Sequence, residues 1–186
     1  MREMKKIFAV SDVKGYLAPL LSALGEAGFD ETDPHHLFVG CGNLFGDEGE
    51  DGDVFRFVTG LKNKVLIRGN RDEHLTVEMV DYLETARYVF VSGWLPTAEN
   101  GAWRGAPPEA WHAARSIGWS GFYGVNDVVS EKTLVCGNGP TRLAYAFDGR
   151  ELGDSGIYYG EGMIAIDAGT ASSGRVNVLV LEDEIK

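Results

Sequence analysis

Five apolar segments of this sequence end in a polar residue beside glycine, and this recurrence limits the fold more than any other feature. The endings read SDVKG, VGCGNLFGD, RGNRDEH, VSGW and VCGNGPT. Glycine lets the backbone turn sharply and approach a ligand closely. In α/β proteins, ligands bind where strands end. The sequence therefore predicts an α/β protein with a ligand site built from loops that follow strands.

The apolar spacing predicts alternating strands and helices along one domain that covers residues 1–186. We expect strands over 6–10, 36–42, 64–70, 88–94 and 132–138, helices over 17–29, 53–61, 76–87 and 107–119, and a closing β-hairpin of 162–170 and 175–183 with ASSG as its turn. This alternation is typical of a sheet that carries helices on both faces.

Residues 95–130 break the alternation, and we interpret them as a small lid or insertion over the edge of the sheet. The segment holds Trp103, Trp111 and Trp119, together with Pro107 and Pro108, which favour a helix start. The tryptophans either line a substrate groove or pack the lid itself.

Charge and composition exclude some classes of partner. The net charge of −11 and the pI of about 4.8 argue against a nucleic-acid or membrane-surface binder. The sequence shows neither a signal peptide nor an apolar run of membrane-spanning length, so we expect a cytoplasmic protein. Cys41 and Cys136 form no CxxC pair, and we expect both to be reduced core residues.

The order of the five endings resembles the calcineurin-like metallophosphoesterases, in particular the bacterial serine/threonine protein phosphatase-like branch. That family has the pattern DxHG, then GDxxDRG, then GNH[ED], then a lone histidine after a strand, then GHxH or GHT. The resemblance covers nearly the whole chain, including the tail IAIDAGTASSGRVNVLVLED. It implies a calcineurin-like α/β sandwich of central sheets flanked by helices.

The resemblance also implies a chemistry, the hydrolysis of phosphate monoesters by two divalent ions that clamp the phosphate and activate a water. The ions are held by Asp, Asn and His ligands. The histidine of GNH[ED] protonates the leaving oxygen, and the acidic residue beside it holds that histidine.

The chain departs from the family pattern at the ligand positions themselves. Asp12 matches the first ligand, but Lys14 stands at the histidine of DxHG, and Asn43 stands at the bridging aspartate. Asn70 matches the asparagine ligand. Arg71 stands at the acid histidine, while Asp72 matches its partner.

The remaining family histidines are absent too. Ser92 stands at the lone histidine, and Asn138 and Pro140 stand at the histidines of the last motif. The resemblance thus gives Asp12, Asn43, Asn70 and Asn138 as a weak or vestigial metal site, and Arg71 and Asp72 as a degenerate acid pair. One carboxylate among neutral amides does not balance two dications.

We therefore expect a catalytically impaired or inactive member that retains the scaffold and binds a phosphorylated small molecule or a phosphoprotein. The candidate phosphate contacts are Lys14, Arg71, Ser92, Arg104 and Arg115. Lys14 would neutralise Asp12 in place of a lost ion, or else it is an ordinary solvated lysine. The alternative is a working phosphomonoesterase or protein phosphatase with a remodelled site that holds one Mg²⁺ or Mn²⁺ ion.

Overall fold

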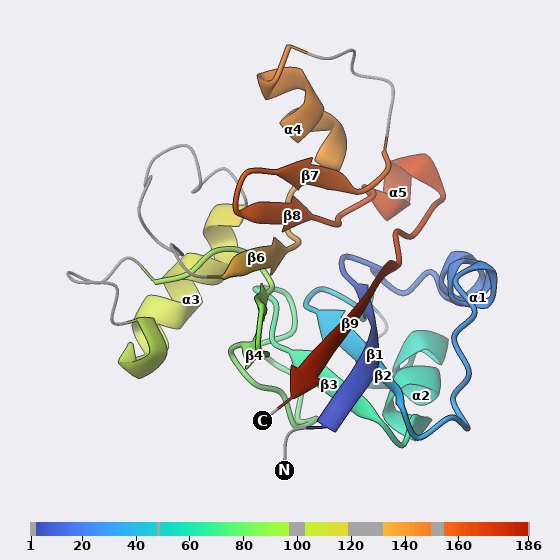
Figure 1. Ribbon diagram of the computed structural model, residues 1–186. Coiled ribbons are helices and arrows are strands. Elements are labelled where there is room, and N and C mark those ends of the chain that lie inside the picture. Colours follow the sequence, from blue (N-terminus) through green and yellow to red (C-terminus); the bar gives the residue numbers. More distant parts are fainter. Residues whose placement is uncertain (1–2, 48, 97–102, 119–131, 150–154, 186) are drawn as a thin grey trace.

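The structure is a computed structural model, and it describes residues 3–47, 49–96, 103–118, 132–149 and 155–185. Two β-sheets face each other in it, and helices cover the outer face of each sheet (Figure 1). The first sheet has the strand order β3-β2-β1-β9 and the second has the order β4-β5-β6-β8-β7.

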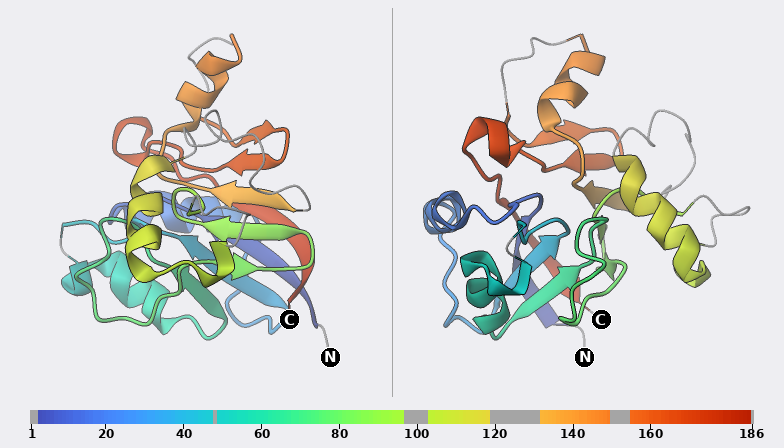
Figure 2. Two further views of the ribbon diagram at one scale, coloured as in Figure 1. Left: turned by 90° about the vertical axis from the view of Figure 1, so that its left-hand side faces the viewer. Right: turned by 180° about the vertical axis from the view of Figure 1, so that it is seen from behind.

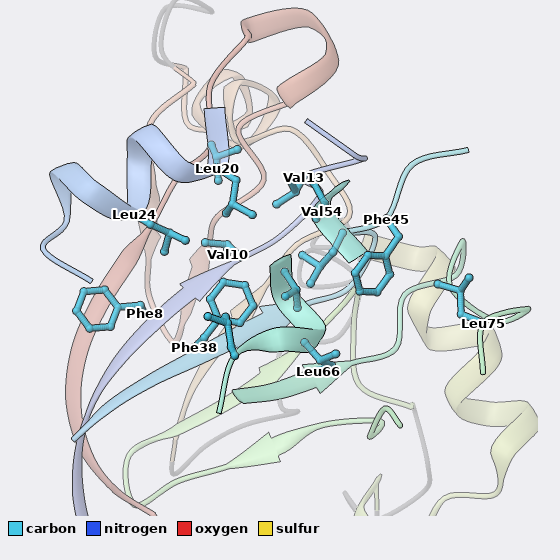
Figure 3. Close-up of a cluster of buried hydrophobic side chains, with 14 residues drawn as sticks. Phe8, Val10, Val13, Leu20, Leu24, Phe38, Phe45, Val54, Leu66 and Leu75 are labelled. Carbon is cyan, nitrogen blue, oxygen red and sulfur yellow. The ribbon is translucent and has the colours of Figure 1, made fainter. Parts of the chain in front are cut away.

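The first sheet is mainly parallel. It comprises β1 (Glu3–Val10), β2 (His36–Cys41), β3 (Lys64–Ile67) and β9 (Leu179–Ile185), of which only β9 runs antiparallel to its neighbour. The helices α1 (Leu17–Glu26) and α2 (Asp53–Gly60) lie against it, with the short 3₁₀ helix η1 (Gly49–Asp51) before α2. Phe8, Leu20 and Val54 belong to the buried cluster between sheet and helices (Figure 3).

The second sheet has a parallel centre and antiparallel edges. Its strands are β4 (Leu83–Glu84), β5 (Tyr88–Val91), β6 (Thr133–Cys136), β7 (Tyr158–Gly160) and β8 (Met163–Ala165). The 3₁₀ helix η3 (Trp103–Gly105) and the helices α3 (Pro108–Ile117) and α4 (Thr141–Phe147) accompany it, and the short α5 (Thr170–Ser173) precedes β9. Figure 2 shows the two sheets and their helices from the side and from behind.

Another buried cluster fills the space between the two sheets. Ile7 and Val39 from the first sheet meet Phe90, Val135 and Ile164 from the second. Cys41 and Cys136 are also buried and free, as the sequence predicted. The two sheets thus share one core, and the polar loops that follow their parallel strands can meet at one edge.

Two predicted elements are wrong. Residues 76–87 form no helix, because Val80 bridges to Ile67 and bonds the backbone of Leu66 and Arg68 as an added edge of the first sheet. The predicted closing hairpin is also wrong. Residues 163–165 pair with β6 and β7 in the second sheet, whereas residues 179–185 pair with β1 in the first.

The lid segment is described in part. Trp103 and Trp111 are buried, and the ring of Tyr82 lies 4.9 and 5.3 Å from theirs. Of the two interpretations of the tryptophans, these two follow the packing one, while Trp119 lies outside the described residues. No helix in the described part of the chain combines the length and hydropathy needed to span a bilayer.

Candidate functional site

The loops that follow the parallel strands hold an unusual backbone conformation. In the described residues, the non-glycine positions with positive φ are Asp12 (51°), Lys14 (53°), Asn43 (55°) and Asn138 (53°). Asp and Asn tolerate this left-handed region better than other non-glycine residues, whereas a lysine such as Lys14 adopts it at a higher energetic cost. Such strain costs about 1–3 kcal/mol per residue and gathers at functional sites. It marks these three loops as the candidate site.

The Asn43 side-chain amide lies at the centre of a group of oxygens. Its Nδ2 donates towards Asp12 Oδ1 (3.2 Å), Asn70 Oδ1 (3.1 Å) and Asn138 Oδ1 (3.4 Å). Its Oδ1 accepts a hydrogen bond from the Arg71 amide at 3.1 Å. That bond fixes which end of the amide faces the three oxygens.

Asp12 is buried, and its carboxylate is held from both sides. Oδ2 accepts the backbone N–H of Asn138 at 2.7 Å, and the Lys14 ammonium lies 3.6 Å from Oδ1. Burial raises the pKa of Asp12 to about 7, and repulsion from Asp167 adds to that rise, while the Asn138 hydrogen bond and Lys14 oppose it. The Lys14 charge therefore faces a buried carboxylate, as one of the two interpretations of the sequence expected.

Asp167 is a site residue that the sequence analysis missed. It follows β8, where it accepts the N–H groups of Gly169 (2.7 Å) and Gly139 (3.0 Å). Burial raises its pKa, and the positive charge of Lys14 opposes the rise. The sequence IDAG carries the same polar-plus-glycine ending as the other strands, and the mistaken hairpin concealed it.

Asp72 fixes two loops to each other. Its Oδ2 accepts the backbone N–H groups of Asn43 (2.7 Å) and Gly69 (3.0 Å), and burial raises its pKa. Gly69 must be glycine for this approach, since a Cβ there would lie 2.3 Å from Asn43 Oδ1. Asp72 thereby positions the Asn43 amide.

Ser92 lies buried beneath the same loops. Its Oγ has no hydrogen-bond partner among the described residues, and a Cβ on Gly42 would come within 2.2 Å of it. Its carbonyl accepts the N–H of Gly137 at 2.9 Å. Ser92 thus touches the loops of the site, but it is buried and does not line the pocket where Lys14 and Arg71 lie, so the structure does not bring it to these two predicted phosphate contacts.

Arg104 and Arg115, by contrast, are engaged by carboxylates. Arg115 pairs with Glu73 (3.1 Å) and with Asp81, and its side chain is 9% exposed. Arg104 forms a two-point contact with Glu84 (2.7 and 2.9 Å). These pairs give both arginines a structural role in fastening the lid segment to residues 73–84.

Arg115→Ala is expected to lower the free energy of unfolding by about 2 kcal/mol, because it strips Glu73 and Asp81 of their shared partner. Arg104→Ala is the matched control, since its pair is half exposed and such pairs contribute at most about 1 kcal/mol. Urea unfolding measures both. Equal losses for the two variants would contradict a special role for the buried guanidinium.

A pocket opens beside this network. It has a volume of about 510 Å³, and Lys14, Arg71 and His74 lie on its wall. Lys14 is therefore shared between the buried carboxylates and the pocket. The described residues bring Lys14 and Arg71 to one opening, while Arg104 and Arg115 do not line it.

The donor set does not fit the dinuclear centre that the fold implies. The three oxygens that would have to face a cation are already met by the N–H groups of Asn43, and an ammonium lies beside Asp12. The described residues contain no group of three or more His, Cys, Asp or Glu side chains arranged to hold a metal ion. Two dications need more negative charge than this arrangement offers.

Comparison with solved structures identifies the architecture. A candidate diadenosine tetraphosphatase matches with a TM-score of 0.62 and 12% identity, over 98% of this chain and 94% of that one. A Saccharomyces cerevisiae protein serine/threonine phosphatase matches with a TM-score of 0.57 and 14% identity, over 98% and 80%. A cold-active protein tyrosine phosphatase of Shewanella matches with 0.56 and 10%, over 99% and 81%.

No protein-family model matches the sequence, and no curated protein matches it. At these identities the structural likenesses show the fold alone. They confirm the fold that the motif order implied, with central sheets flanked by helices.

Proposed function

We propose that this protein, which has the calcineurin-like metallophosphoesterase fold, is a catalytically impaired member that binds a phosphorylated ligand without a dinuclear metal centre. The observation that carries this proposal is the Asn43 amide, whose N–H groups meet the oxygens of Asp12, Asn70 and Asn138. An amide in this position supplies the positive end of a dipole where a hydrolase needs a metal ion. In this proposal, charged side chains bind the phosphate in place of metal ions.

Lys14 and Arg71 are the proposed phosphate contacts. Both line the 510 Å³ pocket, and an arginine fork can hold two phosphate oxygens at once. Lys14 also faces Asp12 at 3.6 Å, which keeps its ammonium at the mouth of the buried network. With no metal-activated water, such a site holds a phosphate ester and does not cleave it.

The test of catalysis is hydrolysis of p-nitrophenyl phosphate with added Mn²⁺ and again with EDTA. We expect no turnover above the protein-free blank in either condition. We expect Mn²⁺-dependent turnover once family ligands are restored in a variant with Lys14→His, Asn43→Asp, Arg71→His, Ser92→His and Asn138→His. Mn²⁺-dependent turnover by the unaltered protein would instead support the one-ion phosphatase.

The test of binding is titration calorimetry with inorganic phosphate in EDTA. Replacing both cations (Lys14→Glu with Arg71→Glu) is expected to weaken binding at least about tenfold, because two charge-assisted contacts become repulsive. The matched control is Lys62→Glu with Arg142→Glu, which changes the net charge equally at exposed positions outside the pocket. If phosphate affinity falls equally in both variants, the loss comes from the change in net charge and not from contacts made by Lys14 and Arg71.

A further inference from the structure

The pocket beside Lys14 has a second wall that phosphate alone does not use. Tyr16 follows the Lys14 loop and lines the pocket with 43% of its surface exposed. Phe45, from the loop after β2, lines the same pocket. Phe45 is itself buried in one cluster with Val13 and Val54 (Figure 3). It also packs edge-on against Phe55, with the ring centroids 5.2 Å apart. Phe45 is thus held in place by its buried neighbours, whereas Tyr16 is exposed to solvent.

Glycines line the same wall as these two aromatic residues. Gly15 and Gly46 meet backbone to backbone, since a Cβ on Gly15 would lie 3.2 Å from the Cα and the nitrogen of Gly46. Gly49 and Gly52 continue this surface into an adjoining hollow of about 220 Å³, which shares Lys14, Tyr16 and Phe45 with the larger pocket. Because these glycines carry no side chain, a planar group can approach the backbone of this part of the wall closely.

The cationic groups lie at one end of the same opening. Arg71 and His74 line the larger pocket with Lys14 but not the glycine-walled hollow, which only Lys14 joins. Arg71 and His74 are exposed, and neither pairs with a carboxylate among the described residues. In the described part of the chain, Asp47 is the one acidic residue that lines the larger pocket, against Lys14, Arg71 and His74. An anionic group is thus favoured beside Lys14 and Arg71, and an apolar planar group is favoured beside Tyr16 and Phe45.

We infer that the site takes a phosphate monoester that also carries a planar aromatic ring, with the phosphate at Lys14 and Arg71 and the ring against Tyr16 and the glycine wall. This inference rests on the proposed function and names the ligand class of the same site. A nucleoside monophosphate and an aryl phosphate share this chemistry. The volume of about 510 Å³ is within the range of small-molecule sites, whereas phosphate alone would leave most of it empty.

The experiment is a calorimetric titration of the full chain in EDTA with four probes: inorganic phosphate, phosphoserine, phosphotyrosine and AMP. We expect the aromatic phosphates to bind about three- to tenfold more tightly than phosphoserine, the gain that one aromatic contact supplies. AMP against phosphotyrosine then separates the two sources of the ring. Adenosine without phosphate is expected to bind far more weakly than AMP.

The variant that tests the ring contact is Tyr16→Ala, read as the ratio of the phosphoserine and aromatic phosphate dissociation constants. We expect this ratio to fall to about one, because only the ring loses a contact. Tyr159→Ala is the matched control, since Tyr159 is 61% exposed and lines neither hollow, and it should leave the ratio unchanged. Tyr16→Phe should preserve the ratio if stacking is the cause.

The possible results separate the two proposals. Binding of inorganic phosphate with no preference for aromatic esters would overturn the ring inference and leave the proposed function standing. Absence of binding by all four probes would overturn both. A preference that survives Tyr16→Ala would place the ring elsewhere and overturn the assignment to this wall.

Discussion

Asn43→Asp is expected to lower the free energy of unfolding by about 3–5 kcal/mol in EDTA, since it leaves a new buried carboxylate facing Asp12. The change removes the N–H groups that now meet the oxygens of Asp12, Asn70 and Asn138, and puts a second negative charge in their place. For a chain of this size, the midpoint of thermal unfolding should fall by roughly 10 °C.

The same variant should gain a response to metal. Its side chain would offer oxygen ligands with Asp12, Asn70 and Asn138, which suits Mn²⁺ or Mg²⁺. Saturating Mn²⁺ at about 100 times the dissociation constant would restore about 2.7 kcal/mol of the loss. The unaltered protein should show no such stabilisation.

Asn63→Asp is the control for this prediction. It makes the same chemical change at a partly exposed position, where we expect less than about 0.5 kcal/mol. Thermal unfolding of the three proteins, with EDTA and with Mn²⁺, gives the answer. Equal stability of Asn43→Asp and the unaltered protein in EDTA would refute the amide-centred network, as would equal stabilisation of both by Mn²⁺.

The free energy of unfolding is expected to decrease by about 2–3 kcal/mol as the pH rises from 5 to 7 in EDTA. The pKa of Asp12 is about 7 in the folded chain, above its ordinary value of 3.8. Between these values the folded state keeps a proton that the unfolded state has released, so each pH unit costs up to about 1.4 kcal/mol. The stabilising proton is fully present below pH 4 and is lost above pH 7.

The neighbouring carboxyls act in the same direction. Burial also raises the pKa of Asp167 and of Asp72. Glu84 has the opposite sign, because its arginine partner lowers its pKa to about 2, but that effect lies below pH 5. Urea unfolding at pH 5, 6, 7 and 8 tests the slope, with Asp12→Asn and Asp167→Asn as variants that should flatten it. Stability that is constant or rising over this interval would refute the prediction.

The order of the strand-end motifs predicted the fold, and it brought Asp12, Asn43 and Asn138 to neighbouring loops, because each motif combines a buried run with a residue suited to a tight turn. Asp12, Asn43 and Asn138 have positive φ, which explains why short polar residues follow these strands. Lys14 has the same positive φ, but its neighbours in the sequence do not predict where its side chain points. The sequence therefore could not decide between a solvated Lys14 and one that faces Asp12. The structure places the Lys14 ammonium 3.6 Å from Asp12 Oδ1, and its positive charge also acts on Asp167, which is distant in sequence.

The errors arise where long-range pairing overrides local pattern. The segment around Val80 has helical spacing, yet its backbone bonds go to Leu66 and Arg68 of the first sheet. The tail contains two apolar runs with a turn between them, yet β8 and β9 join different sheets. No local signal distinguishes a hairpin from two strands that part in this way.

The pairing of β1 with β9 has a consequence for how the chain acquires its structure. The first strand lies between β2 and β9, and its register joins Glu3 to Ile185. Asp183 of β9 also accepts hydrogen bonds from Thr85 (2.6 Å) and from the Arg87 amide (2.7 Å), which links it to the second sheet. During synthesis on the ribosome, β1 emerges before β9, so the edge of β1 that pairs with β9 stays open until β9 follows. Contacts this distant in sequence slow folding. Until β9 pairs with β1, the open edge of β1 can pair with strands of other chains, so this edge is the part of the nascent chain that needs protection for longest.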